Sequence, residues 1–197
     1  MNIHSAVVTR DPEITKKCIL DAALALFAER GFHGTNVPDV AKTAQVGAGS
    51  IYRHFADKVA LVNAVFQQWK LRFTEELLSP APDPRLSYED QFREIWARLW
   101  RFYRKHPQAT IFLDVHAHGD YLSDESRKIA ESLESKFEAW VRGGQKQGAL
   151  VGARPEELIA MVYGAFIGLV KMEINGQTMS ARHQESSGDC AWNLVSP

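Results

Sequence analysis

GFHGTNVPDVAKTAQVGAGSIYRHFADK, residues 31–58, predicts two short helices joined by a tight turn. Thr35 or Asn36 can accept a backbone N–H at the start of the first helix. Apolar residues then recur at helical spacing as far as Ala44. The next three residues, Gln-Val-Gly, are enough only for a turn, and Gly47 can cap the second helix.

The second helix of this stretch has two unlike faces. Ile51 and Phe55 lie four residues apart and share one face, while Tyr52 lies at its edge. The opposite face carries Gly49, Ser50, Arg53 and His54. Small residues with a single arginine suit close approach to a DNA groove, so the stretch predicts a helix-turn-helix. The alternative is an ordinary helical hairpin in a core, which would have little reason to place Tyr52, Arg53 and His54 on a small-residue surface.

The run G-x-x-x-T…V-x-D-V-A-x-x-A-x-V-x-x-G-x-I-Y-x-H-F-x-x-K resembles the DNA-binding signature of TetR/AcrR-type transcriptional regulators, and the match covers about residues 13–61. The resemblance implies a dimer that places two recognition helices in successive major grooves of a palindromic double-stranded operator. It also implies phosphate contacts from Thr35, Tyr52, His54 and Lys58. The full set of DNA-binding residues expected is Thr35, Gln45, Gly47, Ala48, Ser50, Tyr52, Arg53, His54 and Lys58.

Two positions depart from the family pattern. The family usually has Gly where Gln45 stands, so the turn must tolerate a side chain here. It usually has Ser or Thr where Gly47 stands, so the hydroxyl that often contacts a phosphate is missing. Ser50 and Arg53 match the positions that face base edges.

Composition gives little sign of nucleic acid. The 197-residue chain is 45% hydrophobic and 24% charged, with a net charge of −1, which is ordinary for a globular protein. Residues 1–60 carry seven Lys/Arg against six Asp/Glu. Attraction to phosphate must therefore come from a few well-placed cations, backbone N–H groups and helix ends.

The chain shows no targeting or membrane segment that we can identify from sequence. Residues 1–10 lack the apolar core of a signal peptide, and the longest uncharged apolar run, residues 158–170, is too short to span about 30 Å of hydrocarbon. Cys18 and Cys190 predict free thiols rather than a disulfide framework. We expect a cytoplasmic protein without a membrane partner.

Helical periodicity continues through the rest of the chain, which predicts an all-α fold of about nine helices. We expect a loose arm at residues 1–10, a helix-turn-helix domain of three helices at 11–57, and a larger effector-binding and dimerisation bundle at 58–197. The helix after Asp57 carries an apolar stripe that should join the two halves: Val62, Phe66, Trp69 and Phe73. A last helix over residues 180–195 is expected to be interrupted at Ser186-Ser187-Gly188.

Ala160, Gly164 and Gly168 recur every four residues in an apolar helix. Glycine within a helix is unfavourable by about 1 kcal/mol relative to alanine, so close approach of another helix would offset it. The open alternatives are packing within the chain or a void for a ligand. The family resemblance favours a homodimer in which the last two helices of each protomer form a four-helix bundle, with Trp192 also at the interface.

The string DVHAHGD, residues 114–120, could suggest a metal site. However, His116 and His118 are two apart and point to different sides of a helix, so we expect no metal and no cofactor. The simpler interpretation is a helix C-terminus whose dipole favours histidine, which leaves open that one of the two faces a pocket. No nucleophile elbow, phosphate loop, HExxH or CxxC appears, so no catalytic residue is predicted.

Aromatic residues across four of the expected helices have the composition of a small-molecule site. They are Trp96, Trp100, Tyr103, Phe112, His116, Phe137, Trp140, Tyr163 and Phe166. The alternative is that this set is ordinary core. Few charges lie among them, which favours a small hydrophobic or aromatic effector, neutral or weakly polar, that releases a repressor from its operator. Two other classes stay open, namely a DNA-binding protein of the same fold without an effector and an enzyme with a scattered site on a helical scaffold.

Overall fold

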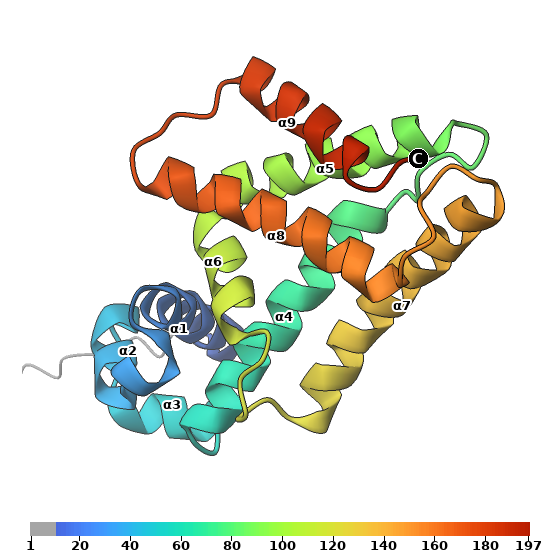
Figure 1. Cartoon of the computed structure of the whole chain (residues 1–197). Helices are drawn as coiled ribbons and strands as arrows, with labels where there is room; N and C mark the ends of the chain where they lie inside the picture. The colour runs from blue at the N-terminus through green and yellow to red at the C-terminus, as the bar shows by residue number, and fades with distance from the viewer. Residues whose placement is uncertain (1–10) are drawn as a thin grey trace, which may run out of the picture.

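The computed structural model describes residues 11–197, and this part of the chain is built from nine helices without a strand (Figure 1). The predicted all-α class is confirmed; the expected arm at 1–10 lies outside the described residues. In order, the helices are α1 Pro12–Gly34, α2 Val37–Ala44, α3 Ala48–His54, α4 Lys58–Leu78, α5 Tyr88–Lys105, α6 Pro107–His116, α7 Asp124–Lys146, α8 Pro155–Ile174 and α9 Ala181–Asn193. None of the nine is long and apolar enough to cross a membrane.

The caps of the first helices follow from their sequence. Asn36 begins α2, and its side chain accepts the N–H of Asp39 at 2.8 Å. Gln45 ends α2 in the left-handed region, with φ 56° and ψ 45°. Glycine adopts this conformation more readily than other residues, which explains why glutamine is a departure at this position. The Gln45 side chain is exposed, so the turn tolerates it.

Helix α4 joins the two halves of the molecule. It begins beside α3 and runs into the bundle, where it packs against α1, α5, α6 and α7 (Figure 1). The predicted stripe of Val62, Phe66, Trp69 and Phe73 is buried along its whole length. The orientation of the helix-turn-helix thus depends on how α4 is held.

The larger bundle is completed by two further pairings, α7 with α8 and α5 with α9. The predicted interruption of the last helix is wrong, because α9 runs unbroken through residues 186–188. The Ser186 and Ser187 hydroxyls donate to carbonyls of the preceding turn, those of His183 and Gln184. Gly188 permits close contact with α5, since a Cβ there would lie 2.8 Å from Trp96 Cδ1.

We predict that Phe66→Ala lowers the free energy of unfolding by about 3–5 kcal/mol, because it removes a fully buried ring from the joint between the two halves. Leu71→Ala on the same helix is the control, since Leu71 is 56% exposed. Urea unfolding followed by circular dichroism measures both. Similar losses for the two variants would contradict the packing described for α4.

Candidate nucleic-acid interface and regulatory cavity

Helix α3 presents one face to solvent and buries the other. Ile51 is 1% exposed and Phe55, just after the helix, is also buried, so the two anchor α3 as predicted. On the outer side Tyr52 is 56% exposed and Arg53 is exposed. The Arg53 guanidinium donates to Ser50 Oγ at 2.8 Å, which holds it along the helix surface. The outer side of α3 thus consists mainly of small residues and carries one arginine whose orientation is fixed by Ser50.

The turn before α3 is open as well. Gln45, Gly47 and Ala48 are exposed, and Gly47 is the N-cap of α3 without a side-chain cap bond. No atom lies within 4 Å of where a Cβ on Gly49 would be. A DNA backbone or groove edge could therefore approach this end of α3 without a steric barrier.

Two of the expected phosphate contacts face inward instead. Thr35 is 1% exposed, and its hydroxyl lies 3.1 Å from the Leu26 carbonyl and 2.9 Å from that of Gly31. Lys58 Nζ donates to the Phe32 carbonyl at 3.0 Å and the Thr35 carbonyl at 3.1 Å, 4.2 Å from the Phe32 ring centre. The assignment of these two side chains to phosphate is corrected: they bind the end of α1 to the start of α4. His54 is half-buried, with its ring 6.3 Å from that of Phe55.

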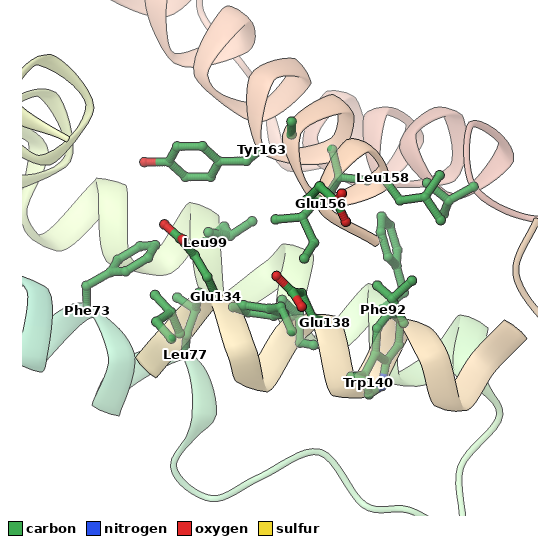
Figure 2. Close-up of a pocket in the computed structure, with 18 of the residues that line it drawn as sticks. Phe73, Leu77, Phe92, Leu99, Glu134, Glu138, Trp140, Glu156, Leu158 and Tyr163 are labelled. Atoms are coloured by element: carbon green, nitrogen blue, oxygen red, sulfur yellow. The ribbon is translucent and has the colours of Figure 1, made fainter. Parts of the chain in front are cut away.

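A cavity of about 390 Å³ lies in the larger bundle, lined from α4, α5, α7, α8 and the end of α6 (Figure 2). Three of the predicted ligand residues line it, namely Phe137, Trp140 and Tyr163. Sequence analysis missed most of its apolar wall, which includes Phe73, Leu77, Phe92, Leu99, Leu133 and Leu158. These residues look like ordinary core in sequence, and only the packing of the helices leaves space between them.

The other six predicted ligand residues are core and do not line this cavity. They are Trp96, Trp100, Tyr103, Phe112, His116 and Phe166. Trp96 and Trp100 pack edge-on against Phe166, with ring centres 6.0 and 5.4 Å away. Of the two histidines in DVHAHGD, His118 lines the cavity and His116 does not.

The cavity wall also carries charged residues, which the predicted set did not include. Lys70 on α4, Glu134 and Glu138 on α7, and Glu156 on α8 all contribute to the wall. Burial lowers the pKa of Lys70, and the charge of Glu134 partly offsets this effect. Burial also raises the pKa of Tyr163, so its hydroxyl stays protonated. The sequence did not single out these charged residues, because a charge on a helix of a globular protein is expected to face solvent.

His116 instead joins the end of α6 to α1. The side chain is fully buried, with Nε2 3.2 Å from the Phe27 carbonyl and Nδ1 bonded to the Tyr121 hydroxyl. A carbonyl only accepts, so Nε2 carries the proton and Tyr121 donates to Nδ1. Tyr121 stacks on Phe32 with ring centres 4.1 Å apart. Within residues 11–197 no group of three or more His, Cys, Asp or Glu side chains could hold a metal ion.

Asn63 joins α4 to the segment that follows α6. Its amide nitrogen donates to the Val59 and Tyr121 carbonyls, each at 2.9 Å. Its oxygen accepts the N–H of Ser123 and the hydroxyl of Ser126, each at 2.7 Å. The buried amide is fully satisfied, which fixes α4 against the start of α7.

Gly164 and Gly168 of the small-residue stripe of α8 lie on the outside of the chain, whereas Ala160 also lines the cavity. Ala160, Gly164 and Gly168 are exposed, and no atom lies within 4 Å of a Cβ built on either glycine. Packing within the chain therefore does not explain the two glycines. Trp192 is half-buried against α5, 5.4 Å from the Phe92 ring, so it already has a partner inside the chain.

Fold and site together define a helix-turn-helix DNA-binding protein with a helical C-terminal domain. The pattern of bacterial regulatory proteins of the tetR family matches residues 19–65, and that of the tetracyclin repressor-like C-terminal domain matches residues 66–196. The chain belongs to the TetR family of transcription regulators. Proteins of this family are not enzymes, which excludes the enzyme alternative.

Relatives support the same assignment. The HTH-type transcriptional regulator RutR of Escherichia coli is 30% identical over 158 residues, which cover 76% of this chain and 71% of RutR. The regulator YhgD of Bacillus subtilis is 26% identical over 157 residues, 79% of this chain and 82% of YhgD. A crystal structure of a TetR family regulator from Marinobacter aquaeolei has a TM-score of 0.83 at 20% identity, covering 93% of this chain and 96% of that one. At that identity the likeness concerns the fold.

We predict that His116 makes stability depend on pH. Burial lowers the pKa of His116 from its ordinary 6.5, so the unfolded chain takes up this proton first as the pH falls. Its contribution is complete above about pH 6.5 and decreases as the pH falls below that value. Burial lowers the pKa of His106 too, so His116→Phe should reduce the slope without abolishing it.

The measurement is the free energy of unfolding by urea at steps from about pH 7.5 to about pH 5. The exposed His183→Gln variant is the control and should keep the wild-type slope. A wild-type slope in His116→Phe would show that this histidine takes up no proton on unfolding.

Proposed function

We propose that this protein is a cytoplasmic, homodimeric repressor that binds a palindromic operator and is released by a small molecule bound in the cavity of its larger bundle. The observation that carries the proposal is the exposed outer face of α3, where Arg53 is oriented by Ser50 beside open small residues. The repressor role is supported by a Mycobacterium tuberculosis protein named an HTH-type transcriptional repressor, 44% identical over 64 residues, 32% of this chain and 34% of that one.

Specific binding would use few charges. Ser50 and Arg53 are the residues available to base edges, and an arginine bidentate to guanine contributes about 1–3 kcal/mol of discrimination. Tyr52 is the exposed hydroxyl beside them and suits a phosphate. Gln45, Gly47 and Ala48 would lie against the DNA backbone at the turn, and half-buried His54 at the other end of the helix.

A homodimer would place two copies of α3 about one helical turn apart. The outward stripe of α8 is the proposed interface, since its glycines would let a partner helix approach closely. Exposed apolar side chains flank the stripe, including Met161 at 45% and Met172 at 41%. Paired faces of this kind resemble the apolar centre of stable homodimer interfaces.

Release would proceed by a population shift. Ala117 and His118 line the cavity directly after His116, which is bonded to α1, and Asn63 holds the same segment to α4. A ligand that displaces this segment would move α1 and α4, and with them α3. Effective induction needs the ligand to favour the released conformer by about 1–3 kcal/mol. The cavity favours this account over a DNA-binding protein without an effector.

Genomic SELEX with the purified protein should enrich an inverted repeat. Arg53→Ala should relax base preference within each half-site by about 1–3 kcal/mol. Tyr52→Phe should weaken all sequences about equally, because a lost phosphate contact carries no sequence information. Enrichment of no inverted repeat by the wild-type protein would refute operator binding.

Gly164→Leu should convert the dimer to a folded monomer. The new side chain meets no atom of its own chain within 4 Å at Cβ, so only a partner helix would exclude it. Gly152→Leu is the matched control, because that loop glycine is also exposed and unobstructed. Analytical ultracentrifugation at micromolar protein decides, with circular dichroism to confirm folding. A Gly164→Leu variant that still dimerises would rule out this interface.

A further inference from the structure

Acidic residues outnumber basic ones in the cavity wall. Lys70 from α4 is the one lysine or arginine among the lining residues, and it lies in the field of Glu134. The carboxylates of Glu138 and Glu156 remain, one from α7 and one from α8. The wall thus carries one ammonium and three carboxylates, in contact with an otherwise mainly apolar space.

Figure 2 shows the Glu138 and Glu156 side chains extending into the space between α7 and α8. Both side chains reach solvent: Glu138 is 30% exposed and Glu156 is 55% exposed. Arg142 and Arg154 form ion pairs with these two glutamates, and neither arginine lines the cavity. Arg142 bonds one oxygen of Glu138 at 2.9 Å, whereas Arg154 approaches Glu156 only to 3.8 Å and bonds Glu157 instead. Apart from Lys70, no lysine or arginine lines the space that these two carboxylates face.

The aromatic residues of the wall would also attract a positively charged ligand. Phe137, Trp140 and Tyr163 line the cavity beside these carboxylates. A positive charge is attracted to aromatic faces, and more strongly away from water. A bare metal ion would leave the apolar wall unused, and residues 11–197 offer no three-residue ligand group for one.

We propose that the effector is an organic cation with a flat apolar or aromatic body. The apolar body of the ligand would occupy the space between Phe73, Leu99 and Tyr163. Its positive charge would lie between the partly exposed carboxylates of Glu138 and Glu156. The inference rests on the proposed role of this cavity as the effector site. It replaces the neutral effector expected from sequence, because the carboxylates became visible only in the folded chain.

Three probes of one shape test the charge: 10-methylacridinium, uncharged acridine and acridine-9-carboxylate. Fluorescence titration of the full-length protein at about pH 8, where acridine is neutral, gives the three dissociation constants. We expect the cation to bind at least about tenfold more tightly than acridine, and the carboxylate to bind most weakly. The cation should also release the protein from its SELEX-selected DNA.

Variants assign the charge to the two carboxylates. Glu138→Gln with Glu156→Gln should remove about tenfold of the affinity for 10-methylacridinium and leave acridine binding nearly unchanged. Glu131→Gln is the control, an exposed glutamate of α7 outside the wall. Both substituted positions of the double variant reach solvent, so it should fold, which circular dichroism verifies.

Equal affinity for the cation and for acridine would overturn the proposal while leaving an effector cavity in place. Tighter binding of the carboxylate, lost in Lys70→Met, would also overturn it and assign recognition to the lysine. Binding of none of the three would reject a flat aromatic cation of this size. Operator selection is measured without any probe, so each of these failures is distinguishable from a failure of DNA binding.

Discussion

The short segment that ends α6 and leads into α7 is the constraint on which the rest of the structure depends. On one side His116 and Tyr121 bind it to α1, through the Phe27 carbonyl and the Phe32 ring. On the other side Asn63 binds it to α4. Among residues 11–197, no other fully buried side chain of the larger bundle forms a hydrogen bond to the helix-turn-helix domain. Its orientation therefore follows the position of this segment.

The hydrogen bonds of Asn63 hold the segment in one position against α4. Breaking any one hydrogen bond of Asn63 leaves a buried polar group unsatisfied, which is unfavourable by about 1–3 kcal/mol. Movement of the segment away from α4 would break these bonds. The same segment contributes Ala117 and His118 to the cavity wall, so in the proposed release a ligand would act on the element that holds the helix-turn-helix. A coupling of the proposed size needs no longer pathway.

Sequence predicted the helical class, the helix-turn-helix and the inner stripe of α4 because each follows from a local rule of spacing or capping. It failed where a side chain's role depends on distant partners. Thr35 and Lys58 match positions of a DNA-binding signature, yet their polar atoms are used by carbonyls at the end of α1. Only three of the nine predicted ligand residues line the cavity, because aromatic composition does not tell a wall from a core. Glu138 and Glu156 are eighteen positions apart in sequence and meet only when α7 and α8 pair.

We propose that two copies of α3 read one DNA site with two-fold symmetry. Hydroxyl-radical footprinting on a selected operator tests it most directly. We expect two protected patches on one face of the duplex, related by a dyad and about 10 base pairs apart centre to centre. A single patch, or protection without a dyad, would contradict it.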